Sequence, residues 1–212
     1  MPPKIIIFDL GRVLIRICDS WQHACAVAGI SAPTGEMDST RDAALLNLVK
    51  LNEVDAIDHQ QFCDRVAPLL DLTPSQIARL SDAYLLGPYP GVRELLAQLR
   101  SAGHMTACLS NTNTNHWRLM NDVANPNALP LDQLDYRFAS QLMRLRKPDD
   151  AIYAAVEQET GCRGDEIVFF DDLPHNVAAA QRRGWRAFQI AIDSDPIQQV
   201  RTHLRIIGLL AT

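Results

Sequence analysis

The stretch that most constrains the fold is Ile5-Ile6-Ile7-Phe8, an apolar run that ends abruptly at Asp9 and is followed by Gly11. A run rich in β-branched residues, bounded by an acid and a glycine, predicts a buried central strand. Open α/β sheets bind their ligands beyond the carboxyl ends of the strands. A carboxylate at that place makes Asp9 a candidate nucleophile.

The composition narrows the classes of partner. The chain has 212 residues, a net charge of −5 and a pI near 5.6. Proteins that bind nucleic acid or anionic membranes need a basic face, so this balance argues against both. The five cysteines form no Cys-x-x-Cys pair, which favours reduced thiols over disulfides or a zinc site. With no signal peptide and no apolar run long enough to span a bilayer, we expect a cytoplasmic protein.

The segment after the first strand has a helical pattern. Apolar residues recur there at helical spacing, as at Ile77, Leu80 and Tyr84, and a stretch rich in Gly and Pro, 87–91, marks its end. We interpret the segment as a helical insert, which either adds to the core or forms a lid over the end of the first strand. The predicted domains are a core of residues 1–17 and 88–212 and a helical cap of residues 18–87.

From Pro90 onward the chain alternates between helix and strand patterns, which is typical of a parallel sheet with crossover helices. The further predicted strands cover residues 105–109, 136–139, 167–170 and 187–190. Three strands end in polar residues: Asp9, Ser110 and the pair Asp171-Asp172. Because the carboxyl ends of parallel strands lie on one edge, we expect these side chains to converge. The predicted fold class is α/β.

Such a cluster has the chemistry of a metal and phosphate site. Asp9 and Asp172 held about 4 Å apart would repel by about 4 kcal/mol at an effective dielectric of about 20. A pair of carboxylates suits Mg²⁺, which also attracts phosphate. The Ser110 hydroxyl, the backbone amides after it and the Lys147 ammonium suit phosphate oxygens. Phosphoryl transfer to Asp9 is therefore a chemically complete hypothesis.

Four segments resemble the ordered motifs of the haloacid dehalogenase superfamily. They are residues 8–14 with Asp9 and Gly11, 109–113 with Ser110 and Asn111, 146–149 with Lys147 and Pro148, and 168–176 with Asp171, Asp172 and Asn176. Each motif alone is weak, but all four in order make a specific signal. The resemblance implies a Rossmann-like core, a small all-helical cap, and Mg²⁺-dependent hydrolysis of phosphate monoesters through an aspartyl phosphate. The residue sequences of the first two motifs are similar to those of sugar-phosphate phosphatases, including glucose 1-phosphate phosphatases.

By this resemblance, Asp9 is the nucleophile and a metal ligand, and the backbone carbonyl of Gly11 is a second ligand. Asp172, helped by Asp171 directly or through water, completes the metal site. Most phosphatases of the family have a second Asp where this chain has Gly11. That residue acts as general acid and then as base, which typically contributes about 10²–10⁴-fold. We therefore expect slow turnover, or leaving groups that need little protonation, such as glycosyl or acyl phosphates.

The resemblance also assigns the phosphate site. Ser110 and the Asn111 amide would hold the phosphate, Lys147 would neutralise both it and the nucleophile, and Asn176 would orient Lys147.

Two further residues have open roles. Arg12 stands where the family often has Gly or Asn, and it either places a cation near the leaving group or points to solvent. His116 either lies on a helix surface or contacts the substrate or the cap.

Two other functions remain alternatives to a phosphatase. One is C–X bond hydrolysis: dehalogenases of the family attack carbon without a metal, and phosphonate hydrolases use a Schiff-base lysine from the cap, where Lys50 is the only lysine. The other is a weakly active phosphate-binding module, because Gly11 removes a functional group. The sequence leaves the identity of the substrate and the oligomeric state open.

Overall fold

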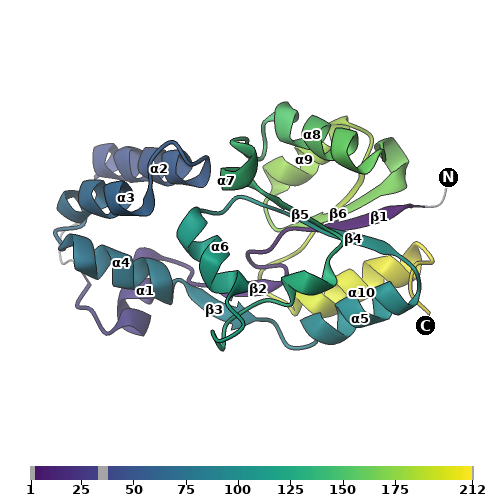
Figure 1. Cartoon of the computed structure of the whole chain (residues 1–212), viewed down its shortest axis with the longest axis horizontal. Coiled ribbons are helices and arrows are strands. Elements are labelled where there is room, and N and C mark those ends of the chain that lie inside the picture. Colours follow the sequence, from purple (N-terminus) through teal and green to yellow (C-terminus); the bar gives the residue numbers. More distant parts are fainter. Residues whose placement is uncertain (1–2, 33–37, 212) are drawn as a thin grey trace.

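The computed structural model describes residues 3–32 and 38–211 (Figure 1). Five parallel strands form one sheet in the order β5-β4-β1-β6-β7, and β2 pairs with β3 in a two-stranded antiparallel ribbon. The strands are β1 (Ile5–Phe8), β2 (Ile15–Ile17), β3 (Leu85–Pro88), β4 (Met105–Ser110), β5 (Tyr136–Ala139), β6 (Ile167–Asp171) and β7 (Arg186–Gln189). The parallel sheet confirms the predicted α/β class.

Helices cover both faces of this sheet and form a separate group at one end of the molecule (Figure 1). The α-helices are α1 (Trp21–Ala28), α2 (Ser39–Glu53), α3 (His59–Val66), α4 (Pro74–Ala83), α5 (Val92–Ser101), α6 (Thr114–Asn121), α7 (Ser140–Met143), α8 (Asp150–Thr160), α9 (Pro174–Arg182) and α10 (Pro196–Ile206). Short 3₁₀ turns are at Ala67–Leu69, Leu131–Gln133 and Gly164–Glu166.

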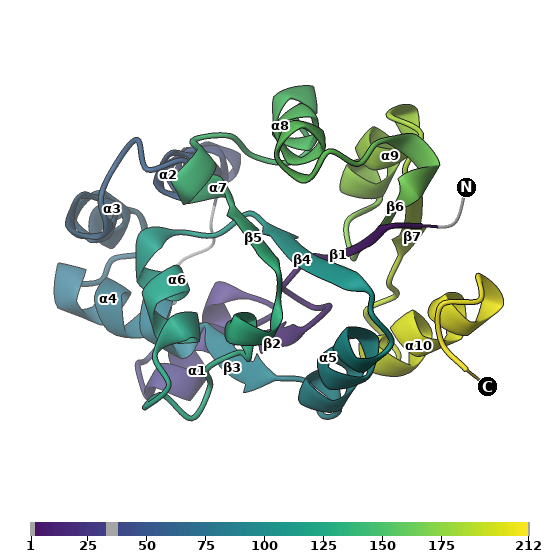
Figure 2. The ribbon, with the colours of Figure 1, turned by 45° about the vertical axis from the view of Figure 1, so that its right-hand side comes forward.

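β1 lies at the centre of the sheet because its side chains are apolar in both directions. Successive residues of a strand point to opposite faces. Ile6 and Phe8 accordingly pack in the cluster that contains residues of α5 and α10, whereas Ile5 and Ile7 pack with residues of α8 and α9. Figure 2 shows these two pairs of helices on opposite faces of the sheet. All four side chains are buried, so β1 is anchored from both sides.

The strand order places the carboxyl end of β1 at a switch point. β4 and β5 extend the sheet on one side of β1, and β6 and β7 extend it on the other. In open α/β sheets, the crevice where the chain winds away in both directions is the usual ligand site. Asp9, the residue after β1, stands at that crevice.

The helices α1 to α4 pack around an apolar cluster of their own, which includes Phe62, Ile77 and Leu80. This separate cluster supports the proposed division into core and cap. The end of the insert differs from the helical prediction, because residues 85–87 belong to β3. Pairing with β2 draws them into a strand, and the Arg16 guanidinium also donates to the Leu86 carbonyl at 2.9 Å. The ribbon of β2 and β3 therefore carries the chain between core and cap.

Among the helices in the described part of the chain, none combines the length and apolarity needed to cross a bilayer. All five cysteines are buried with free thiols.

Candidate active site

Asp9 is held at the end of β1 by its backbone and by its side chain. Its amide donates to the Phe170 carbonyl at 2.8 Å, and the pairing of Phe8 with Phe170 brings Asp9 level with Asp171. The Asp9 Oδ1 accepts from the Leu10 amide at 2.7 Å and lies 3.0 Å from Lys147 Nζ. The carboxylate is thus buried and fixed in one orientation, as a nucleophile requires.

Lys147 reaches this carboxylate from the loop between α7 and α8. Its Nζ lies 2.6 Å from Asp171 Oδ2 as well as near Asp9, and the side chain is only 1% exposed. The Asn111 side chain holds the Lys147 backbone by two hydrogen bonds of 2.9 Å, donating to its carbonyl and accepting from its amide. The sequence predicted a phosphate contact through the Asn111 backbone. The positioning of Lys147 by the Asn111 side chain was missed.

Asp171 links Lys147 to Asn176. The Asn176 amide nitrogen donates to both carboxylate oxygens of Asp171, at 3.0 and 3.1 Å, and the Leu173 amide donates to Oδ1 at 2.8 Å. Asn176 therefore acts on Lys147 through Asp171, which is how it could orient the lysine. Both oxygens of Asp171 accept hydrogen bonds within the protein, which makes this residue less available to a metal than Asp9 or Asp172.

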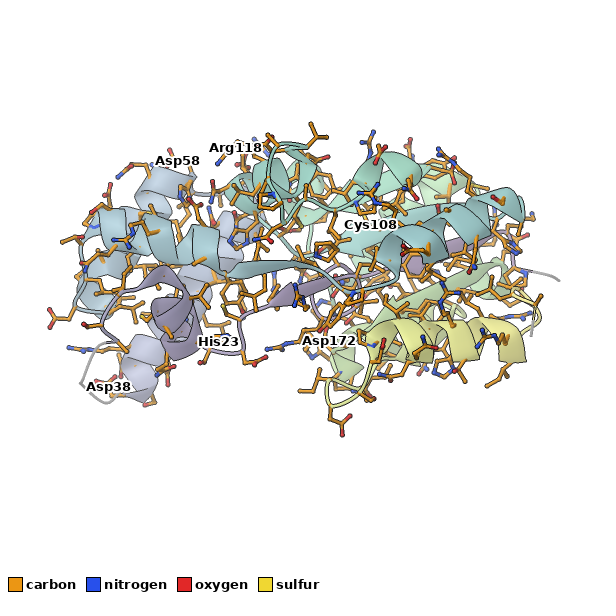
Figure 3. All side chains as sticks on the ribbon, turned by 90° about the horizontal axis from the view of Figure 1, so that it is seen from below. His23, Asp38, Asp58, Cys108, Arg118 and Asp172 are labelled. Atoms are coloured by element: carbon orange, nitrogen blue, oxygen red, sulfur yellow. The ribbon has the colours of Figure 1, made fainter. Side chains whose placement is uncertain are left out.

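Asp172 lies between the cap helices and the core, where Figure 3 labels it. Its Oδ2 is 3.7 Å from one terminal nitrogen of Arg12, whose other terminal nitrogen is 3.6 Å from Asp19 Oδ1. Arg12 was expected either to place a cation near the leaving group or to point to solvent. Its guanidinium lies inside the site, and the side chain is only about a quarter exposed. Its backbone is left-handed, with φ at 58°, a conformation that non-glycine residues seldom adopt.

The three carboxylates fit a divalent cation. One oxygen each from Asp9, Asp171 and Asp172 lies within 4.8 Å of the others, and all three residues are buried. At this separation each pair repels by about 3 kcal/mol at an effective dielectric of about 20. Against the three negative charges the site has one fully buried cation, Lys147. Asp9, Asp172 and the Gly11 carbonyl are the oxygens that could hold Mg²⁺.

The closeness of these carboxylates also shifts the pKa values of the charged groups in the site. Burial raises the pKa of Asp9 to about 7, a shift to which Asp171 and Asp172 contribute and which Lys147 opposes. Burial also raises the pKa of Asp172, with Asp171 adding to the effect and Arg12 opposing it. Burial works against the charge of Lys147, yet the carboxylates of Asp171 and Asp9 raise its pKa above the ordinary value. A cation near Asp9 and Asp172 would keep both ionised.

A cavity of about 450 Å³ opens above these residues, and Ser110, at the end of β4, also lines it. This volume suits a small metabolite. The cap contributes a wall that the sequence did not identify. Its side chains are Trp21, Val49, Asn52, Glu53, Phe62, Ser81 and Tyr84.

One contact joins this cap wall to the loop that carries Lys147. Glu53, the last residue of α2, accepts from Arg146 Nε at 3.1 Å and from a terminal nitrogen at 2.8 Å. The only sequence signal for this pair was the position of Arg146 directly before Lys147, because the partners are 93 residues apart.

His116 contacts the cap. Its Nε2 lies 2.8 Å from the Ser81 carbonyl and 3.2 Å from the Ser81 hydroxyl, and its ring stacks on Tyr84 with centroids 6.0 Å apart. Burial lowers the pKa of His116 to about 4, so the imidazole is neutral near pH 7. His116 also lines the cavity, but its Nε2 is occupied by Ser81.

The surroundings of Gly11 and Lys50 bear on two hypotheses drawn from the sequence. A Cβ built on Gly11 would meet only Ile17 Cδ1, at 3.4 Å, so the position has room for a side chain. Lys50 is exposed on α2, and the described side chains that line the cavity do not include it. A Schiff base from Lys50 therefore has no support in this arrangement.

Comparisons with known proteins agree with the fold. The model for haloacid dehalogenase-like hydrolases matches residues 3–184. Haloacetate dehalogenase H-2 of Moraxella sp. (strain B) is 27% identical over 139 residues, which cover 65% of this chain but only 59% of that enzyme.

Two solved structures illustrate the likeness in fold. A HAD family enzyme of Bacteroides thetaiotaomicron aligns with a TM-score of 0.80 at 23% identity, covering 95% of this chain and 100% of that one. The L-2-haloacid dehalogenase of Xanthobacter autotrophicus, with chloropropionic acid covalently bound, aligns with a TM-score of 0.63 at 22% identity, covering 99% of this chain and 85% of that one. With a family model that spans most of its length, this chain belongs to the haloacid dehalogenase-like hydrolases.

Proposed function

We propose that this hydrolase is a Mg²⁺-dependent phosphatase of small phosphorylated metabolites, with sugar phosphates as the substrate class. The observation that carries the proposal is the setting of Asp9. This carboxylate lies 3.0 Å from Lys147 Nζ, beside the buried carboxylates of Asp171 and Asp172, and opens into a cavity of metabolite size.

In this reaction an oxygen of Asp9 attacks phosphorus and the ester oxygen leaves, which produces an aspartyl phosphate that water then hydrolyses. Lys147 offsets the charge of the phosphate and the nucleophile, and Ser110 donates a hydrogen bond to a phosphate oxygen. Mg²⁺ held by Asp9, Asp172 and the Gly11 carbonyl would supply positive charge against the carboxylates and the phosphate.

A relative supports the choice of metal and of phosphate. The Bacteroides thetaiotaomicron enzyme has also been solved in complex with magnesium and inorganic phosphate, and that structure aligns with a TM-score of 0.71. The cap wall supports the choice of sugars. Aromatic residues (Trp21, Phe62 and Tyr84) and polar residues (Asn52 and Ser81) line it together, which suits a substrate with apolar faces and hydroxyl edges.

Hydrolysis of a carbon–halogen bond is the second candidate. Arg12 lies 3.7 Å from Asp172, so a protein cation partly offsets the carboxylate that would otherwise need a metal. Haloacetate dehalogenase H-2 of Moraxella and the L-2-haloacid dehalogenase of Xanthobacter are also similar to this chain. In this reaction Asp9 would attack carbon and halide would leave.

One experiment separates the two candidates. The purified protein is incubated with a panel of sugar phosphates and a panel of 2-haloacids, each with Mg²⁺ or with EDTA, and released phosphate or halide is measured. We expect phosphate release that EDTA and Asp9→Asn both abolish. Halide release that survives EDTA would establish the second candidate instead.

The absence of turnover on both panels would leave a phosphate-binding module. Binding of beryllium fluoride that depends on Asp9 would then identify the occupied phosphate site.

A further inference from the structure

Glu53 is placed by the cap in the same cavity as the nucleophile. It is the last residue of α2 and lines the cavity together with Asp9 and Lys147. Its ion pair with Arg146 bridges from cap to core, and the side chain is only 16% exposed. Because Arg146 directly precedes Lys147, this ion pair ties the Glu53 carboxyl to the loop that carries the catalytic ammonium.

The two carboxyl oxygens of Glu53 have different surroundings. Oε2 accepts both hydrogen bonds from Arg146, at 3.1 and 2.8 Å. Oε1 has no hydrogen-bond partner among the residues that the structure describes, and it keeps some exposed surface. A proton on this carboxyl therefore belongs on Oε1, while Oε2 stays bound to Arg146 in either protonation state.

The charges around Glu53 oppose its burial. Burial raises the pKa of Glu53, whereas Arg146, Lys147 and the neighbouring Lys50 on α2 lower it. Burial favours the acid form of Glu53, whereas the nearby cations favour its carboxylate form. A group that must donate a proton and then accept one needs both forms within reach.

Asp19 and His116, two other titratable groups of the cavity, are less suited to this role. The Asp19 side chain is 79% exposed, lies near Arg12 and His23, and so faces solvent more than the reacting groups. His116 Nε2 is bound to Ser81. Gly11 has no side chain, which leaves the loop after β1 without an acid.

We propose that Glu53 is the general acid and base of this hydrolase, supplied by the cap in place of the missing side chain at Gly11. This inference rests on the proposed phosphatase function. It revises the expectation that only easily departing groups are cleaved, because a proton donor is present on the cap wall.

Glu53 donates a proton in the first half of the proposed reaction and accepts one in the second. As the bond between Asp9 and phosphorus forms and the ester bond breaks, the proton on Glu53 Oε1 passes to the departing alkoxide, which leaves as an alcohol. The Glu53 carboxylate then removes a proton from the water that attacks the aspartyl phosphate. Inorganic phosphate leaves, and Asp9 and the acid form of Glu53 are restored.

The test is a series of phosphate monoesters with different leaving groups, assayed with the full-length Glu53→Gln protein and Mg²⁺. Glutamine keeps an oxygen for Arg146 but cannot transfer a proton. We expect kcat/KM to fall by about 10²–10⁴-fold on alkyl phosphates and to change little on 4-nitrophenyl phosphate, whose leaving group needs no proton. The limb of the pH–rate profile that reports the ionisation of Glu53 should disappear as well.

Asp55→Asn is the matched control. Asp55 lies two residues further along, near Arg144 and Thr114, and the residues that line the cavity do not include it. Asparagine tolerates its left-handed backbone, with φ at 56°. This variant should follow the wild type on every ester. Gly11→Asp added to Glu53→Gln should restore activity on alkyl phosphates, because the position has room for the side chain.

Three outcomes would overturn the inference. One is an equal loss on all esters, which would make Glu53 only a positioning residue for Arg146. Another is a wild-type profile in Glu53→Gln. The third is the same selective loss in Asp19→Asn and not in Glu53→Gln. If Glu53→Gln does not fold, Glu53→Asp replaces it and should show a smaller loss with the same dependence on the leaving group. A wild-type protein that cleaves no phosphate ester would instead refute the proposed function.

Discussion

The wall of the cavity formed by the sheet and the wall formed by the cap are built by different kinds of contact. On the sheet side, Asp9, Lys147 and Asp171 lie on the ends of neighbouring strands or on a loop bound to them, and they are almost completely buried. Each position depends on the register of β1 with β4 and β6. The geometry is therefore as rigid as the sheet.

On the cap side, polar side chains from α2 and α4 reach toward the core. Glu53 binds Arg146, Ser81 binds His116, and Asp82 Oδ1 accepts from Asn115 at 2.8 Å. These contacts hold the cap against the core without a shared apolar cluster, since the cap packs around its own. In the proposed reaction, the sheet wall carries the nucleophile and its cation, and the cap wall carries the proton donor.

The largest expected effect tests the sheet wall. Asp9→Asn removes the nucleophile, so kcat should fall by about 10⁴-fold or more on every substrate. Steady-state assays on the full substrate panels measure the loss. Asp132→Asn, the same change at an exposed site, is the control. Residual activity of Asp9→Asn close to that of the wild type would show that another group forms the covalent bond.

Lys147→Met should destabilise the protein as well as inactivate it. The change leaves Asp9 and Asp171 buried without their cation, and breaking a buried pair in this way costs about 3–5 kcal/mol. Urea unfolding followed by circular dichroism measures the free energy of unfolding.

Lys50→Met, at an exposed position, should change this free energy by less than about 0.5 kcal/mol. Adding Asp171→Asn to Lys147→Met should recover part of the loss. If Lys147→Met and Lys50→Met had the same free energy of unfolding, the stability of the sheet wall would not depend on the buried charge of Lys147.

The next prediction concerns pH and the cap wall. The pKa of His116 is about 4 in the folded protein because of burial, against about 6.5 in an unfolded chain. Between these values the unfolded state binds more protons, so this contribution to stability is complete above about pH 6.5 and is lost as pH falls toward 4. The loss should amount to about 1–3 kcal/mol.

His116→Asn should remove that part of the pH dependence. Because the carboxylates titrate in both proteins, the difference between wild type and variant from pH 7.5 to pH 4.5 isolates the histidine. Parallel stability curves for the two proteins would contradict the assigned burial.

The smallest expected effect concerns a single hydrogen bond between cap and core. Asn115→Ala removes the donor to Asp82 and, within α6, the Oδ1 that accepts from Arg118 at 3.2 Å. The change should cost about 1 kcal/mol, seen as a lower Tm and a KM raised by up to about fivefold. Asn121→Ala, on the same helix, breaks only a bond to the Trp117 carbonyl within α6 and should leave KM unchanged. A larger fall in kcat than rise in KM for Asn115→Ala would show that the cap contact also positions the reacting groups.

Much of the sheet wall was predictable because it follows from local patterns. An apolar run that stops at an acid encodes both a buried strand and a carboxylate at its end, as at Asp9 and Asp171. Other features could not be predicted in this way. The Asn111 side chain binds the Lys147 backbone 36 residues away, and residues 85–87 become a strand only because β2 lies beside them.

The sequence by itself determined the parallel sheet, the helical insert and the polar residues at the strand ends. These depend on the periodicity of neighbouring side chains, which a short stretch of chain contains completely. Only the tertiary structure decided that Asn176 reaches Lys147 through Asp171 and that Glu53 pairs with Arg146 across the cavity. Such contacts depend on where the cap lies relative to the sheet, and that placement results from the packing of the whole chain.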